Sequence, residues 1–132
     1  MTQEEARQAA IRDLMKKADA ALAAAFREHA AGDLNLAMNR VYYACFYAAS
    51  AVLLKERLEF ARHAGVRAAI HRHLVRPGRV SPEMGTFYDQ AFRDRQEADY
   101  GSAVQFDPTP VLSCIEEAKQ FVSEMRRLLG SG

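Results

Sequence analysis

Apolar residues recur at spacings of three and four along nearly the whole chain, and this pattern limits the fold more than any other feature. It is clearest near the C-terminus, where one stripe contains Val111, Ile115, Ala118, Val122, Met125 and Leu129. Residues at these spacings lie on one face of an α-helix, whereas a half-buried strand needs a strict alternation that no stretch shows convincingly. The sequence therefore predicts an all-α chain.

Local start and stop signals divide the chain into helices. These signals are Thr2 with Glu5, Gly32 followed by Asp33, Ser81-Pro82-Glu83, and Gly101. The predicted helices are residues 3–31, 34–57, 65–75 and 82–100, followed after a loop at 102–108 by a last helix that opens at Thr109-Pro110 and ends at Gly130. Four long helices and one short one, joined by short loops, predict one domain over residues 1–132. Its expected architecture is an antiparallel up-down helical bundle.

The composition is that of an ordinary globular domain. The chain has 132 residues, 49% of them hydrophobic and 27% charged, and its formal net charge is +1, which gives no overall field for nucleic acid or membrane. The longest uncharged run, residues 41–54, is shorter than the roughly 20 residues of a membrane-spanning helix. The N-terminus lacks a signal-peptide pattern, and Cys45 and Cys114 fit a reducing compartment. We therefore expect a cytoplasmic protein without a membrane anchor.

A basic segment, residues 61–80, lies within this neutral total. It contains no acid but five arginines: Arg62, Arg67, Arg72, Arg76 and Arg79. The segment is either a solvated helix face with a loop, or a patch that binds phosphate or an acidic partner, since clustered arginines suit both of these ligands.

His71 and His73 stand two residues apart and so point to different sides of a helix. We therefore predict no metal site and no cofactor.

Polar residues interrupt the otherwise apolar helix predicted at 34–57. Asn39, Tyr43 and Tyr47 are spaced by four and share one helix face, next to Arg40. A buried hydroxyl or amide needs a hydrogen-bond partner. The stretch is therefore either a polar seam with a function, or a core helix whose polar groups bond to their neighbours.

A second polar stretch, residues 93–101, ends the helix at 82–100. Arg95 and Asp99 are i,i+4 neighbours, and Asp89, Arg93 and Glu97 form a second ladder at the same spacing. Such ladders are often surface ion pairs worth a few tenths of a kcal/mol each. Alternatively, Asp99 orients the planar fork of Arg95 to bind a phosphate or a carboxylate.

The order of three motifs resembles the HEPN domain family. The motifs are NRVYYACFYAASAVL, RHAG and RQEADYG, and the resemblance is to the small stand-alone branch with an R-x-x-A-D-Y motif, over roughly residues 10–128. This resemblance implies an up-down bundle, a homodimer, and a small nucleotidyltransferase as the partner in a toxin–antitoxin pair. Active HEPN toxins are metal-independent ribonucleases whose signature is Arg, four to six residues, then His. There Arg stabilises charge on the attacked phosphate and His moves a proton.

This sequence departs from that signature at one position. Arg95 matches the motif arginine, but Tyr100 stands where His is expected, and no histidine follows His73. Tyrosine, with a pKa near 10, is a poor general base at neutral pH. His63 is a further candidate, because a helical bundle can bring it to face Arg95. In some members the partner adenylylates a tyrosine two residues past the His. The matching position here is Ser102, so Tyr100, two residues before it, is close but out of register.

We therefore expect a HEPN protein that works with a nucleotidyltransferase and binds a nucleotide or RNA phosphate. The candidate binding residues are Asn39, Arg40, Tyr43, His63 and Arg95, and the candidate catalytic residues are Arg95, Asp99 and Tyr100. One alternative is an RNA-cleaving toxin in which Tyr100 or His63 replaces the usual His. Another is a structural interaction module whose motif residues serve a dimer core, with the dimer packed through helix 34–57 or the end of helix 82–100.

Overall fold

The computed structural model describes residues 1–100 and 105–130, and every regular element in this part of the chain is helical. The elements are α1 (Gln3–Ala30), α2 (Leu34–Lys55), α3 (His63–Ile70), the π-helical turn η1 (His71–Val75), α4 (Pro82–Tyr100) and α5 (Pro108–Gly130). The prediction of an all-α bundle with four long helices and a short one is confirmed. The predicted stop at Gly101 and most of the loop at 102–108 lie outside the described residues.

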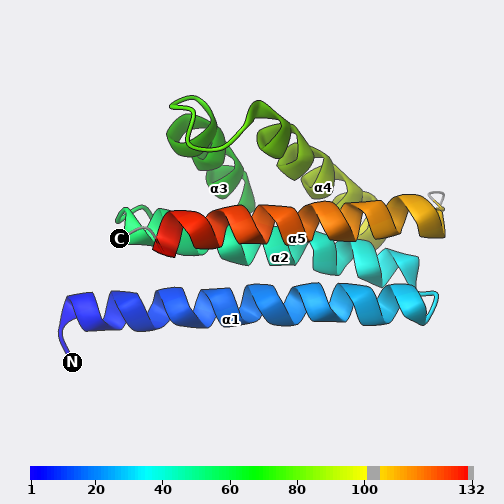
Figure 1. Cartoon of the computed structure of the whole chain (residues 1–132), viewed down its shortest axis with the longest axis horizontal. Coiled ribbons are helices and arrows are strands. Elements are labelled where there is room, and N and C mark those ends of the chain that lie inside the picture. The colour runs from blue at the N-terminus through cyan, green and yellow to red at the C-terminus, as the bar shows by residue number, and fades with distance from the viewer. Residues whose placement is uncertain (101–104, 131–132) are drawn as a thin grey trace.

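Helix α2 lies at the centre of the bundle. Consecutive long helices run in opposite directions, so that α2 and α5 run the same way and lie side by side, with α1 below them and the α3–α4 unit above (Figure 1). Hydrogen bonds tie both ends of α5. Lys55 at the end of α2 donates to the carbonyls of Leu128 and Leu129, and His29 in α1 contacts the Pro108 carbonyl at 2.8 Å.

Three predicted helix starts, those of α1, α2 and α4, are confirmed by their side-chain caps. Thr2 and Glu5 form the reciprocal capping box, and Asp33 accepts from the Leu36 backbone N–H. Ser81 accepts from the Met84 backbone N–H at 3.2 Å. Each of these caps satisfies backbone donors that have no partner inside the helix.

The core is built around α2, which packs against α1, α3, α4 and α5. Tyr42, Tyr88 and Phe121 are among the largest side chains that are fully buried. The apolar stripe of α5 is buried as predicted except at its end, where Leu128 is buried and Leu129 only partly so. Burial of such side chains contributes about 1.5–3 kcal/mol each, so this interior supplies most of the stability.

Four predicted boundaries shift, two of them by one residue, since α1 ends at Ala30 and α5 begins at Pro108. Helix α2 ends at Lys55 rather than near Arg57, because Arg57 adopts a left-handed backbone with φ of +64° that terminates the helix. The short helix begins at His63 rather than Gly65, and its last turn widens into η1.

In the part of the chain that the structure describes, no helix combines the length and the apolar character needed to cross a membrane.

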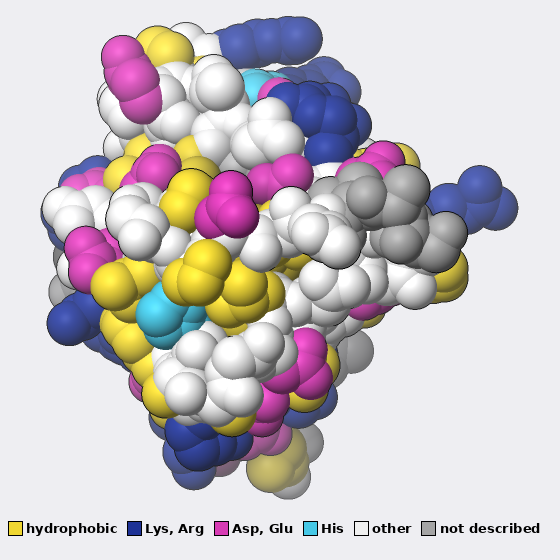
Figure 2. Space-filling view, turned by 90° about the vertical axis from the view of Figure 1, so that its right-hand side faces the viewer, with side chains coloured by type: hydrophobic (Ala, Val, Ile, Leu, Met, Phe, Trp, Pro, Cys, Tyr) yellow, Lys and Arg dark blue, Asp and Glu magenta, His cyan; other side chains and the backbone are white. Residues whose placement is uncertain are grey.

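Figure 2 shows the end of the molecule where α4 stops and α5 starts: several Lys and Arg side chains stand together at its upper right, while Asp and Glu side chains scatter over its middle.

Candidate functional site

Arg95 on α4 is held in place from two helices. Its Nε lies 3.0 Å from Oδ2 of Asp99, one turn along the same helix, and its Nη2 donates to the Tyr43 hydroxyl on α2 at 3.1 Å. The guanidinium also stands over the rings of Tyr42 and Tyr43, 5.7 and 5.4 Å from their centroids. Only 18% of the Arg95 side chain is exposed. The predicted Arg95–Asp99 pair is thus formed, and it fixes the direction of the arginine fork.

Asn39 connects a second arginine to this pair. Its Nδ2 donates to both oxygens of Asp99, at 3.1 and 3.2 Å, and its Oδ1 accepts from Nε and Nη2 of Arg40, at 3.0 and 2.7 Å. The Arg40 guanidinium lies over the Tyr43 ring, 5.2 Å from its centroid. Two guanidinium groups are therefore anchored around one tyrosine.

His63, the first residue of α3, comes to the same place. Its Nδ1 lies 2.6 Å from the Tyr42 hydroxyl, and its ring stacks on Phe46 with centroids 4.3 Å apart. Burial lowers the pKa of His63, and the positive charge of Arg95 lowers it further. His63 and Arg95 both lie against the rings of Tyr42 and Tyr43, so the fold brings the two side chains to the same pair of tyrosines.

We call this group the Arg95 cluster. It consists of Asn39, Arg40, Tyr42, Tyr43, His63, Arg95 and Asp99. It unites every candidate binding residue predicted from the sequence with two of the three candidate catalytic residues. Tyr42 and Phe46 were missed, because a helical repeat alone does not show which of several tyrosines meets a histidine on another helix.

Tyr100 lies apart from the cluster contacts. It is the last residue of α4 and 79% exposed. Ser102, the position that the family resemblance matches to an adenylylated tyrosine, lies outside the described residues. Tyr47, the third residue of the predicted polar face, packs its ring against that of Tyr43, with the centroids 5.7 Å apart. Lys17 of α1 lies over the Tyr47 ring.

The second predicted ladder on α4 does not form. Asp89 instead accepts from Arg67 Nε at 2.7 Å, and His71 Nε2 lies 3.0 Å from the same oxygen. Arg93 donates to Gln90 rather than to an acid of the ladder. The reason is that α3 and η1 pack on the α4 face that carries Asp89 and bring it stronger partners than its own helix offers.

The basic segment is partly neutralised by acids of the bundle. Arg67 pairs with Asp89, and Arg79 donates to both oxygens of Glu56 at 2.7 Å. Arg62, Arg72 and Arg76 are exposed. Some arginines of the segment therefore serve the fold and others face solvent, and the patch for phosphate or an acidic partner stays a prediction.

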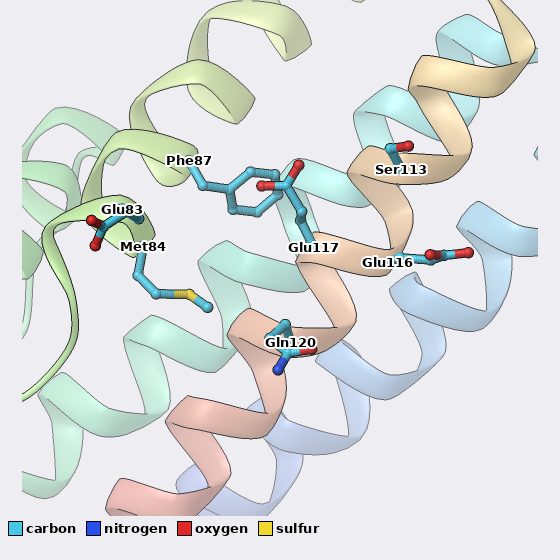
Figure 3. A pocket seen from close by; sticks show the side chains of 7 residues that line it. All are labelled: Glu83, Met84, Phe87, Ser113, Glu116, Glu117 and Gln120. Atoms are coloured by element: carbon cyan, nitrogen blue, oxygen red, sulfur yellow. The ribbon is translucent and has the colours of Figure 1, made fainter.

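A groove of about 410 Å³ lies between α4 and α5, away from the Arg95 cluster (Figure 3). Met84 and Phe87 line it together with the carboxylates of Glu83, Glu116 and Glu117. Its acidic lining does not suit phosphate, and it contains none of the predicted site residues.

Among the described residues, no group of three or more His, Cys, Asp and Glu side chains could hold a metal ion.

The Arg95 cluster has the chemistry of an oxyanion site. Arg95 and Arg40 provide permanent positive charge and N–H donors in a planar fork, which suits phosphate oxygens. His63 adds an imidazole whose lowered pKa favours the neutral form at neutral pH. Such a set can bind a phosphate group, and with a suitable proton carrier it can stabilise charge on a phosphate under attack.

Comparison with known proteins places the chain in a family. The HEPN domain family matches residues 11–128. A UPF0332 protein of Thermotoga maritima is 42% identical over 96 residues, 73% of each chain. Two proteins of Methanocaldococcus jannaschii that carry the name "Putative toxin" are also similar: one is 22% identical over 88% of this chain and 79% of its own, and the other 31% over 70% and 69%. Because the family match spans nearly the whole helical bundle, the chain belongs to the HEPN domain family.

Proposed function

We propose that this protein binds the phosphate of RNA or of a nucleotide at the Arg95 cluster, as a toxin-like member of the small stand-alone HEPN branch. One observation carries the proposal: Arg95 is oriented by Asp99 and Tyr43, while a second anchored arginine, Arg40, and the His63 imidazole pack against the same tyrosine. A surface arginine that served only solubility would not need partners on two helices. The names of the two archaeal relatives support the toxin assignment.

Binding to single-stranded RNA tests this proposal directly. We expect Arg95→Ala to weaken binding of a fluorescent oligoribonucleotide by about tenfold or more, which corresponds to the loss of one good charge-assisted contact. The slope of log affinity against log salt should also become shallower by about 0.7, the value for one lost phosphate contact on a single strand.

Arg93→Ala is the matched control, because Arg93 lies on the same helix but is exposed and donates to Gln90. It should leave the affinity nearly unchanged. Equal losses in the two variants, or no loss in either, would rule out a site at Arg95. Unfolding of Arg95→Ala would favour the structural interaction module instead.

The proposal includes two kinds of partner. One is a small nucleotidyltransferase, sought as the product of a neighbouring gene, and the other is a second copy of the chain packed through α2 or the end of α4. Co-expression followed by size-exclusion chromatography tests both. Growth arrest on expression, relieved by Arg95→Ala and by the nucleotidyltransferase, is the expected result for a toxin–antitoxin pair.

A second candidate function is metal-independent RNA cleavage, favoured by the packing of both His63 and Arg95 against Tyr42 and Tyr43. Total RNA incubated with the protein and a chelator should then be cut by the wild type but not by Arg95→Ala. His63→Asn should lower the rate by about 10²–10⁴-fold if His63 carries the proton, and Tyr100→Phe should do so if Tyr100 does. No cleavage by the wild type leaves the binding function alone.

A further inference from the structure

The hydrogen bond between Tyr42 and His63 determines what the Arg95 cluster offers to a ligand. A neutral imidazole has one N–H donor and one acceptor nitrogen, and its partners decide which nitrogen is which. The Tyr42 hydroxyl lies 2.6 Å from Nδ1 of His63, and Tyr42 is fully buried. His63 therefore directs Nδ1 at the protein interior, and Nε2, across the ring, points away from this hydroxyl.

Both partners are neutral when this bond forms at neutral pH. Burial raises the pKa of Tyr42 to about 12, so its hydroxyl keeps its proton. Burial and the charge of Arg95 lower the pKa of His63, so its imidazole lacks the second proton. Between a neutral phenol and a neutral imidazole, the phenol is the stronger acid and the ring nitrogen the stronger base. The favoured arrangement is thus O–H of Tyr42 donating to Nδ1.

The buried surroundings of Tyr42 agree with this direction. Tyr88 packs against Tyr42, with ring centroids 5.8 Å apart, and its own buried hydroxyl has no aligned hydrogen-bond partner among the described residues. If Tyr42 directs its proton at His63, its oxygen is left free to accept from Tyr88 after a small adjustment. The reverse arrangement would require the Nδ1–H of His63 to donate to the same oxygen.

We infer that Tyr42 is a positioning residue that holds His63 as the tautomer with its proton on Nε2, so that His63 presents a donor to an anionic ligand at Arg95. The inference rests on the proposed function for the identity of that ligand as a phosphate. It assigns His63 the role of a phosphate hydrogen-bond donor. In this tautomer Nδ1 is occupied by Tyr42 and Nε2 carries a proton, so the neutral ring has no free nitrogen to act as a general base. The inference is therefore an alternative to RNA cleavage with His63 as the general base.

Nuclear magnetic resonance of the ¹⁵N-histidine-labelled protein at neutral pH tests the inference without any ligand. Long-range ¹H–¹⁵N correlations distinguish the protonated from the unprotonated ring nitrogen, and His63→Asn identifies the signals. We expect Nε2 of His63 to be protonated in the wild type, and Tyr42→Phe to produce a mixture of tautomers. Tyr43→Phe is the matched control, because Tyr43 touches the His63 ring only edge-on and its hydroxyl bonds to Arg95.

RNA affinity gives a second readout. If Tyr42→Phe lowers the fraction of the competent tautomer to between a third and a half, binding of the oligoribonucleotide should weaken about two- to threefold. A wild-type proton on Nδ1, or tautomer populations that Tyr42→Phe leaves unchanged, would overturn the inference. The spectra require no RNA, so a protein that binds none would overturn the proposed function while leaving the positioning of His63 standing.

Discussion

Asn39 on α2 donates from Nδ2 to both carboxylate oxygens of Asp99 on α4, across 60 positions of sequence. The same carboxylate lies 3.0 Å from Arg95 Nε. This one contact therefore joins the central helix to the end of α4 and fixes the orientation of the arginine. The Asp99 side chain is 24% exposed, so water screens the pair only in part.

The first prediction exchanges Asn39 and Asp99. Asn39→Asp places a carboxylate against that of Asp99, and we expect it to lower the free energy of unfolding by about 1–3 kcal/mol, the cost of a lost charged hydrogen bond. Asp99→Asn should be destabilising as well, because it leaves Arg95 without its counter-charge. The double exchange Asn39→Asp with Asp99→Asn restores one acid and one amide and should recover most of the loss. Urea unfolding measures all four proteins, and strictly additive losses would contradict a direct contact.

The second prediction concerns Gly85, which lies under η1. A Cβ atom at this position would come within 2.9 Å of both His71 Cε1 and Val75 Cγ2. The His71 ring cannot easily move, because its Nε2 contacts Oδ1 of Asp89. Gly85→Ala should therefore destabilise the protein by about 1–3 kcal/mol, despite the better helix propensity of alanine.

Gly130→Ala serves as its control, since an added Cβ there meets nothing within 4 Å. Thermal unfolding should show a clear fall in Tm for Gly85→Ala and almost none for Gly130→Ala. A Gly85→Ala protein as stable as the wild type would mean that η1 can shift away from α4 at little cost.

The third prediction is a loss of stability in acid through Asp89. Partial burial raises the pKa of this carboxyl, but hydrogen bonds and charge from His71 and Arg67 outweigh burial and lower the pKa below its ordinary value. A group whose pKa is lower in the folded state stabilises the protein above its unfolded pKa, near 4, and loses that contribution as the pH falls through the folded pKa. Asp89→Asn should therefore be less stable than the wild type at pH 7, and the difference should shrink below about pH 4. A difference that is constant from pH 7 to pH 3 would show that the charge of Asp89 does not matter.

Sequence reasoning succeeded where the deciding interactions are local. The caps at Thr2 and Ser81 involve partners three residues away, so the helix starts could be predicted. It failed for Asp89, whose partner was sought on its own helix although Arg67 and His71 reach it from α3 and η1. Spacing along one helix shows which residues share a face, but not which element packs against that face.

The same limit applies to the candidate site. Asn39 with Tyr43, and Arg95 with Asp99, could be selected because a spacing of four places each pair on one helix face, and Arg40 stands next to Asn39. Their assembly with His63 depends on how α3 docks, and no local pattern encodes that. The widening of the last turn at η1 was missed for a similar reason, since the close approach of His71 to Gly85 is a tertiary contact.

The last prediction concerns Tyr100. At 79% exposure, this side chain stands out from the end of α4, and its hydroxyl can reach the active site of another protein without unfolding of the bundle. If the proposed nucleotidyltransferase partner adenylylates this chain, incubation with that protein and ATP should add one adenylyl group to the peptide that contains Tyr100. Mass spectrometry of the digested protein locates the group, and Tyr100→Phe, which keeps the ring and removes the hydroxyl, should abolish it.

An unmodified Tyr100 peptide, or a group that persists in Tyr100→Phe, would show that Tyr100 is not the site of adenylylation. Because Tyr100 follows Asp99 directly, modification should also weaken RNA binding at Arg95, since an added phosphate brings negative charge to the edge of the cluster.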